Sequence, residues 1–158
     1  MLERVERLMP ADHQTHRRFE FAVPDGTRQL RLHVRYQPKF ISAQESSRLV
    51  ASTIAARSAG LAAQVGQKLA HQWEAYFEGA DLRVPNLLTI SLDDAKGAYR
   101  GAGHRHAAEQ ELSLSATAAS PGLIAGDLPP GRWTLTVTAH TLVSVQCELE
   151  IQIGAEIA

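Results

Sequence analysis

The sequence predicts a mainly β protein, an antiparallel jelly-roll-like β-sandwich into which a helical segment is inserted. Apolar and polar residues alternate over several short runs on both sides of residues 42–78, as in half-buried antiparallel strands. Residues 42–78 themselves contain no proline and space their large apolar side chains at helical intervals. We therefore expect one β-sandwich domain over 17–158 with a helical insertion at 42–78, preceded by a flexible segment at 1–16.

Two strands are expected before the insertion. Phe19, Phe21 and Val23 alternate with polar or small residues, and this run ends at the Pro-Asp-Gly sequence of residues 24–26, which favours a turn. A second alternating run covers residues 30–36. The two runs should form a hairpin or lie in facing sheets.

The insertion opens on Ser42-Ala-Gln-Glu45, a capping-box pattern that marks the start of a helix. One unbroken helix over the whole segment would extend well beyond a domain of this size. We expect a break at residues 58–60 and a two-helix hairpin, with one long helix as the alternative and Gly79 as the C-terminal cap. The large apolar residues at helical spacing are Val50, Ile54, Leu61, Val65, Leu69, Trp73 and Tyr76.

Small residues form a second stripe along the insertion. Small side chains allow another helix backbone to approach closely. We expect this stripe either to make a symmetric homodimer or to pack the two halves of one hairpin against each other. Its members are Ala51, Ala55, Ala59, Ala62, Gly66 and Ala70.

The period of two returns after the insertion. Alternating runs cover residues 88–92, 112–115, 133–138 and 143–153, and the last of these is the longest. With the two earlier runs they give at least six strands joined by short, turn-rich links, which is typical of a β-sandwich. Within the last run, Cys147 falls on the apolar phase and is expected in the core.

Composition excludes several classes of function. The 158 residues carry a net charge of −1, so no basic surplus indicates binding to nucleic acid or to an anionic membrane. The single cysteine excludes an internal disulfide. The sequence shows neither a secretory signal nor an apolar run long enough to cross a membrane, and we expect a cytoplasmic protein that needs no cofactor.

Two histidines are the candidates for metal binding. His104 and His106 form an H-x-H pair, which can supply two imidazole ligands when it lies on a strand. The nearest carboxylates, Glu109 and Glu111, have no diagnostic spacing, and the surrounding residues are rich in Gly and Ala. A solvated loop is therefore the favoured interpretation, and no metal site or catalytic residue is expected.

Other potential motifs have simple structural explanations. The Asp-Asp pair at residues 93–94, followed by Gly97, indicates a turn rather than a calcium loop. His13 and His16 lie in the N-terminal segment and are expected to be mobile. No nucleophile elbow, phosphate-binding loop or dinucleotide fingerprint occurs in the sequence.

The most specific local feature is a Gly- and Pro-rich stretch that leads into Trp133. Pro130 and Gly131 fit the two central positions of a type II turn, and Trp133 then opens a strand in phase with Leu135 and Val137. The positions that define the stretch are Pro121, Gly122, Gly126, Pro129, Gly131 and Trp133.

Together with residues 19–24, 88–93 and the small-residue loop at 97–103, this stretch resembles a β-sandwich module of bacterial PHP-type metallohydrolases similar to carbaryl hydrolase. In those enzymes the module precedes the catalytic domain. The resemblance covers 17–37 and 86–153, and the metal motifs of the catalytic domain have no counterpart in this chain. It therefore implies an accessory module rather than an enzyme.

We accordingly expect a non-catalytic binding or protein-interaction module, either accessory to a PHP-type metallohydrolase or standing alone. One alternative is a small metal-dependent hydrolase that uses His104 and His106. Another is a carbohydrate-binding jelly roll. Carbohydrate binding usually needs exposed aromatic side chains, and most of the nine aromatic residues fall on the core phase of their strands.

Overall fold

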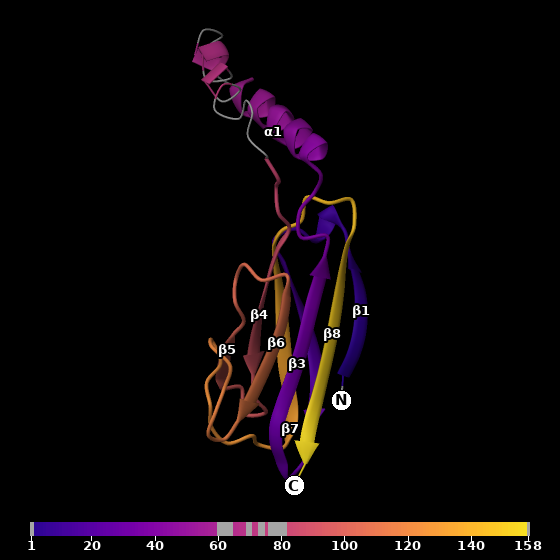
Figure 1. The fold of residues 1–158 in the computed structure, drawn as a ribbon, viewed down its shortest axis with the longest axis vertical. Helices are drawn as coiled ribbons and strands as arrows, with labels where there is room; N and C mark the ends of the chain where they lie inside the picture. Colours follow the sequence, from indigo (N-terminus) through magenta and orange to yellow (C-terminus); the bar gives the residue numbers. More distant parts are fainter. Residues whose placement is uncertain (1, 60–64, 69–70, 73–74, 76–81, 158) are drawn as a thin grey trace. The chain divides into compact units, whose positions relative to one another are not determined.

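The computed structural model describes residues 2–59, 65–68, 71–72, 75 and 82–157 (Figure 1). The chain divides into two compact units, one formed by residues 1–39 and 86–158 and the other by residues 40–85. The larger unit is a β-sandwich, and the smaller unit is the helical insertion. Among the described residues, no helix is both long enough and apolar enough to cross a membrane.

Eight strands make up the described part of the sandwich, in two antiparallel sheets of four. One sheet has the order β1-β8-β3-β6 and the other the order β2-β7-β4-β5. The strands are β1 (Leu2–Leu8), β2 (Thr15–Val23), β3 (Thr27–Gln37), β4 (Leu87–Asp93), β5 (Tyr99–Ala102), β6 (Glu109–Ser115), β7 (Gly131–Thr141) and β8 (Cys147–Ile157).

The strand pairs are nested. β1 pairs with β8, β2 with β7, β3 with β6 and β4 with β5. Contacts between β3 and β8 and between β4 and β7 complete the two sheets. The consecutive strands β2 and β3 therefore lie in different sheets, so the facing-sheet alternative for these two strands is confirmed and the hairpin alternative is wrong.

The core lies between the two sheets. Alternate residues of β3 and β8 face alternate residues of β2, β4 and β7, and they form one cluster of buried apolar side chains. Each such side chain stabilises the fold by about 1.5–3 kcal/mol relative to an exposed position. Members with almost no exposed surface include Leu30, Leu88, Leu92, Leu114, Trp133, Leu135, Cys147, Leu149 and Ile151.

The N-terminal residues differ from the expectation of a flexible segment at 1–16. β1 pairs with β8 over seven positions, from Leu2↔Ile153 to Leu8↔Cys147. A 3-10 turn (η1, Pro10–Asp12) follows, and β2 begins at Thr15. β1 was hidden in the sequence because charged residues occupy both of its faces, which removes the alternation that marks a half-buried strand.

His16 is likewise held rather than frayed, since its Nδ1 lies 2.9 Å from Thr138 Oγ1. In the preceding turn, the carboxylate of Asp12 accepts a hydrogen bond from the backbone N–H of Met9 and pairs with Arg17. These two contacts lower the pKa of Asp12. The turn between β1 and β2 is thus fixed by specific contacts.

Asn86 joins the chain on either side of the insertion to the link between β7 and β8. Its side chain is buried, and Nδ2 donates to the carbonyl of Pro38 and to Ser144 Oγ, each at 2.8 Å. Its Oδ1 accepts from the backbone N–H groups of Val143 and Ser144. The backbone N–H of Asn86 also donates to the carbonyl of Lys39. All the hydrogen-bonding capacity of the side-chain amide is therefore used within the fold.

Asn86 also explains an error in the predicted strand at 143–153. The structure ends β7 at Thr141 and begins β8 at Cys147, so Val143 and Val145 belong to the link between them. Because the amide of Asn86 binds this link, it does not continue the ladder, and Val145 is 77% exposed. A second difference concerns the expected loop at 97–103, which contains the short strand β5.

In the smaller unit, helix α1 (Ala43–Ser58) has the predicted capping box. Glu45 N–H donates to Ser42 Oγ. The hydroxyl of Ser42, and then its backbone N–H, donate to the Glu45 carboxylate and lower the pKa of Glu45. The helix ends at Ser58 with Ala59 as its C-cap, at the expected break. Several predicted positions of the insertion lie outside the described residues. They are Leu61, Ala62, Leu69, Ala70, Trp73, Tyr76 and Gly79.

The two ends of the insertion meet. Phe40 and Pro85 form an antiparallel bridge, and Ile41 N–H donates to the carbonyl of Val84. Val84 N–H in turn donates to the buried hydroxyl of Ser46 in the first turn of α1. The insertion therefore begins and ends at neighbouring points.

We predict that Trp133→Ala lowers the free energy of unfolding by about 3–5 kcal/mol, because the ring is fully buried and the loss leaves a cavity. Urea denaturation followed by far-UV circular dichroism measures the change. The control is Val145→Ala, which removes an exposed side chain and should change the stability by less than about 0.5 kcal/mol. Equal stabilities of the two variants would contradict the assignment of the core.

Candidate functional site

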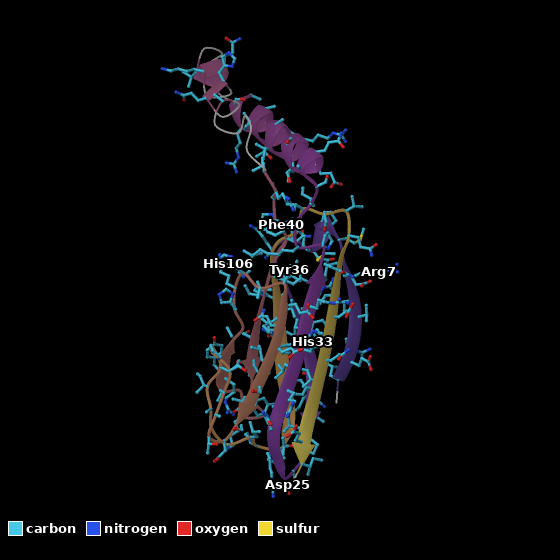
Figure 2. The ribbon with its side chains drawn as sticks, viewed as in Figure 1. Arg7, Asp25, His33, Tyr36, Phe40 and His106 are labelled. Atoms are coloured by element: carbon cyan, nitrogen blue, oxygen red, sulfur yellow. The ribbon has the colours of Figure 1, made fainter. Side chains whose placement is uncertain are left out.

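The outer face of the β1-β8-β3-β6 sheet carries rows of polar residues. His33 of β3 lies between Glu111 of β6 and Gln152 of β8 in the strand register. In the next row, Arg31 of β3 lies between Ser113 and Gly154. These residues alternate with the core positions of the same strands, so the folding of the core fixes their direction. Figure 2 shows His33 on this sheet.

A hollow of about 460 Å³ lies on this face. Gly154 contributes no side chain there, and a Cβ atom built on it would contact nothing within 4 Å. The hollow exists because the long side chains of the neighbouring rows surround this glycine. Its polar lining comes from Gln29, Arg31, His33, Glu111, Ser113 and Gln152.

Three pairs fix the charged side chains at and beside the hollow. Arg31 binds Glu156 at 2.6 Å, and Arg35 binds Glu150 at 2.6 Å. His33 Nε2 lies 2.8 Å from Glu109 Oε1. Glu150 raises the pKa of Arg35. Since these pairs are exposed in part and screened by solvent, they contribute little to stability, and their main effect is to orient the side chains.

Three polar groups of the lining are available to a ligand. Within the described residues, the carboxylate of Glu111 and the amides of Gln29 and Gln152 form no side-chain hydrogen bond or ion pair. Together they offer acceptors and donors that converge on one hollow. The lining contains no Phe, Tyr or Trp side chain, so hydrogen bonds and not ring stacking would hold a ligand.

The structure places His104 and His106 in the link between β5 and β6, where both are exposed. Their ring centroids are 6.1 Å apart, and His106 N–H donates to His104 Nδ1. Figure 2 shows His106 on this link. In the described ranges of the chain, no group of three potential metal ligands comes together.

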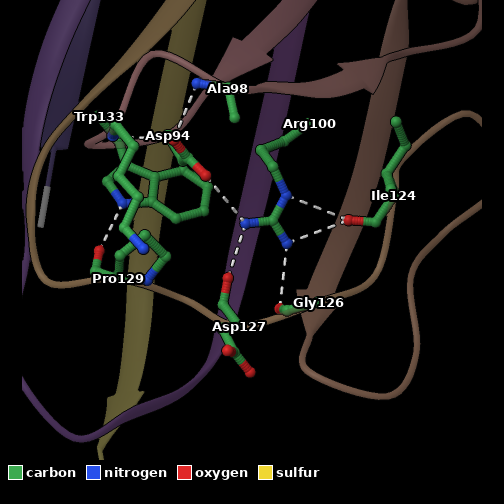
Figure 3. Close-up of polar contacts among 9 residues, drawn as sticks. Asp94, Ala98, Arg100, Ile124, Gly126, Asp127, Pro129 and Trp133 are labelled. Carbon is green, nitrogen blue, oxygen red and sulfur yellow. Dashed lines mark hydrogen bonds and ion pairs between the residues drawn. The ribbon is translucent and has the colours of Figure 1, made fainter.

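Asp94 and Arg100 form a buried ion pair that the sequence did not reveal. Arg100 Nη1 lies 3.5 Å from Asp94 Oδ2, and both side chains are 7% exposed. Asp94 also accepts from the backbone N–H groups of Lys96 and Ala98, which confirms the predicted turn at residues 93–97. The guanidinium carbon of Arg100 lies 5.2 Å from the ring centroid of Trp133. Figure 3 shows these two side chains and the polar contacts around them.

Arg100 organises the Gly- and Pro-rich stretch that precedes β7. Its guanidinium donates to the backbone carbonyls of Ile124, Gly126 and Asp127 (Figure 3). Because its donors are used in this way, Arg100 holds the loop and is not free to bind a ligand. The signal that could have identified it is a charged residue at a strand position beside small residues.

The same loop approaches β5 closely. A Cβ atom on Gly101 would lie 2.2 Å from the carbonyl oxygen of Gly122, and one on Gly122 would lie 2.2 Å from that of Ala102. Both glycines have positive φ angles. Glycine is therefore required at both positions, which accounts for part of the glycine pattern seen in the sequence. Gly131 has a φ of 130°, and β7 begins there.

The small-residue stripe of the insertion is described only in part. Ala51, Ala55 and Ala59 are exposed in α1 and at its C-cap. Gly66 is buried, and a Cβ atom on it would lie 3.1 Å from the carbonyl oxygen of Ser58. This member of the stripe therefore serves packing within the chain. Ala62 and Ala70 lie outside the described residues.

Cys147 lies in the core, as expected. It has no exposed surface, and burial raises the pKa of its thiol to about 11. The thiolate is the reactive form of cysteine, and at neutral pH it is almost absent here. Cys147 is thus a small core residue.

No family model matches the sequence, and no curated protein matches it. A search of solved structures finds, among others, the crystal structure of a protein from Sulfurospirillum deleyianum. It is 8% identical to this chain, with 98% of each chain covered and a TM-score of 0.35. A likeness at this level carries no inference about function.

We predict that Arg100→Met lowers the free energy of unfolding by about 3–5 kcal/mol, because it leaves the buried carboxylate of Asp94 without its counter-charge. The matched control is Arg132→Met, since Arg132 pairs with Glu20 on the exposed surface. It should change stability by less than about 1 kcal/mol. Urea denaturation distinguishes the two, and a loss for Arg100→Met no larger than for the control would contradict this role.

Proposed function

We propose that the chain is a non-catalytic binding module that receives a polar ligand in the hollow on the outer face of β8, β3 and β6. The observation that carries this proposal is the set of polar groups left available by the described residues, Glu111, Gln29 and Gln152, around the bare backbone of Gly154. Binding sites are concave and place a few polar groups so that they converge on the ligand. This hollow has both properties.

The chemistry of the lining favours a neutral, hydroxyl-rich ligand such as a saccharide. A carboxylate accepts hydrogen bonds from neighbouring hydroxyls, and each amide both donates and accepts. The positive charge of Arg31 is already paired with Glu156, so this guanidinium is not a free cation for a phosphate. Without an aromatic platform the binding should be weak, with a Kd of about 1 mM, equivalent to about 4 kcal/mol.

The strand order supports the same proposal by analogy. The nested pairing of eight strands in two sheets is the order of a jelly roll, an architecture that occurs in lectin domains. Fold alone does not establish function, and for this reason the hollow and not the topology carries the argument.

The sequence resemblance adds one proposed partner, a PHP-type metallohydrolase to which this chain would be accessory. A binding module of this kind would bring the enzyme close to a saccharide-bearing surface or substrate. The alternative of a small hydrolase that uses His104 and His106 is less well supported, since the described residues place no third ligand beside the two rings.

The test fills the hollow. We predict that soluble saccharides shift the backbone amide resonances of His33, Glu111 and Gln152 in ¹⁵N NMR titrations of the wild-type chain. Gly154→Gln should weaken this binding at least about tenfold, an effect of about 1.4 kcal/mol, without loss of fold, because the position is open.

The control for this substitution is Thr136→Gln, on β7 of the other sheet, which should leave binding unchanged. A panel of neutral, acidic and amino sugars that causes no shift at these three residues would contradict the proposal, as would equal binding by Gly154→Gln. Stoichiometric zinc that is lost in His104→Ala would instead favour the hydrolase.

A further inference from the structure

The two edges of the sandwich are closed to different degrees. At the β5 and β6 edge, the loop between β6 and β7 forms the bridges Gly101↔Leu123 and Leu114↔Ala119, which cover both strands. β1 and β2 are the end strands of their sheets at the other edge, and Figure 1 shows β1 on the side away from β5. Among the described residues, no other segment pairs with the outer side of β1 or β2. An uncovered strand of this kind presents unpaired backbone groups to other chains.

The sequence of β1 complements itself in the antiparallel direction. β1 reads Leu-Glu-Arg-Val-Glu-Arg-Leu from Leu2 to Leu8. A two-fold axis at Val5 places Glu3 opposite Arg7, Arg4 opposite Glu6, and Leu2 opposite Leu8 of the second strand. We propose that a second copy of this chain docks here, β1 against β1, and joins the two β1-β8-β3-β6 sheets into one continuous sheet.

The geometry of an antiparallel ladder permits this pairing. The axis at Val5 relates even-numbered positions to even-numbered ones and odd-numbered to odd-numbered. Because alternate residues of a strand direct their backbone groups to the same side, the unpaired N–H and C=O groups of one β1 meet those of the other. Paired side chains also lie on the same face of the sheet. Glu3 and Arg7 of the two copies thus meet on the outer face, on either side of the two Val5 side chains.

The side chains that would make the contact are available. Val5 is 63% exposed, and Glu3, Arg4 and Arg7 are exposed as well. Figure 2 shows Arg7 directed away from β1. In the part of the chain that the structure describes, none of the four charged residues of β1 forms an ion pair.

The charges allow only this register. A shift of two residues in one direction places Glu6 opposite Glu6, and a shift in the other direction places Arg4 opposite Arg4. A parallel, in-register arrangement brings each charge beside its own kind. Like charges opposite each other destabilise a ladder. The alternating charges of β1 therefore disfavour pairing with other strands, but they favour antiparallel pairing with a second β1 in the register centred on Val5.

A groove of about 380 Å³ runs along the same edge and includes Leu2, Arg4 and Glu6 of β1 together with Phe19 of β2. Leu2 and Phe19 are half-buried there. In the paired arrangement, Arg4 and Glu6 of the second copy lie beside the β1 side of this groove and cover the half-buried Leu2, whereas Leu8 is already buried in the core of its own chain. Pairing therefore shields apolar surface as well as backbone groups, and the assembly is closed and symmetric.

Charge reversal tests the pairing. Wild-type protein should sediment as a dimer in analytical ultracentrifugation. Arg4→Glu and Glu6→Arg, each alone, replace two attractive pairs by two repulsive ones and should weaken self-association at least about tenfold. An equimolar mixture of the two variants should dimerise, because the introduced glutamate of one variant then faces the introduced arginine of the other. The double variant Arg4→Glu/Glu6→Arg should dimerise by itself.

Other outcomes overturn the proposal. The proposal is wrong if the wild-type chain remains monomeric at all concentrations. It is also wrong if both single variants form the dimer as well as the wild type does. A dimer lost in Ala55→Glu/Ala59→Glu but kept in Arg4→Glu would place the interface on the helical stripe instead. Should either single variant lose its β circular dichroism spectrum, Val5→Lys replaces it, since Val5 is exposed and two lysines would then meet at the axis.

Discussion

The buried amide of Asn86 is the contact on which the sandwich depends at the point where the chain leaves it for the insertion and returns. Its Nδ2 binds the chain just before the insertion, at Pro38, and its Oδ1 binds the link between β7 and β8. Its own carbonyl accepts hydrogen bonds from Tyr36 Oη and Lys39 Nζ. A long insertion makes it entropically costly to bring its two ends together. These hydrogen bonds offset that cost and allow β3 and β4 to keep their places in the two sheets.

Arg100 is a second fixed point of the sandwich. It binds three carbonyl groups of the loop before β7 and pairs with Asp94, while its guanidinium packs near Trp133. This loop covers the edges of β5 and β6. The β1 and β2 edge has no such loop among the described residues. The charge pattern of β1 therefore determines which strand can pair with this edge. One side of the sandwich is closed within the chain, and the other is open to a partner.

Much of the fold could be predicted from the sequence, because strands β2, β3, β4 and β7 alternate between core and solvent. β1 and β5 could not. β1 carries charges on both faces, and β5 is short and contains Gly101. The link at residues 142–146 looked like a strand since Val143 and Val145 continue the alternation of β8, and only the distant side chain of Asn86 ends the ladder there. The alternation of apolar and polar residues indicates which residues of one segment are buried. It gives no information on hydrogen bonds from residues that are distant in the sequence.

The candidate site shows the same division. The polar phase of β3 and β6 indicates that Arg31, His33 and Glu111 face solvent, yet the hollow also requires β8 to lie beside β3 and to place Gly154 opposite Arg31. That neighbour relation comes from the nested topology and cannot be obtained from local spacing. The histidines of the H-x-H pair had the stronger sequence signal, whereas the structure leaves them on a link at the surface.

The central claim, that Asn86 anchors the junction, is tested most directly by urea denaturation of Asn86→Ala beside Gln146→Ala, which changes an exposed residue of the same link. Asn86→Ala removes the hydrogen-bond partner of one buried backbone group, at Ser144, and of two partly buried ones, at Pro38 and Val143, and each loss costs up to about 1–3 kcal/mol. We predict a loss of at least about 3 kcal/mol in the free energy of unfolding for Asn86→Ala and less than about 0.5 kcal/mol for the control. A loss below about 1 kcal/mol for Asn86→Ala would contradict the account, because it would mean that the sandwich holds the junction without this amide.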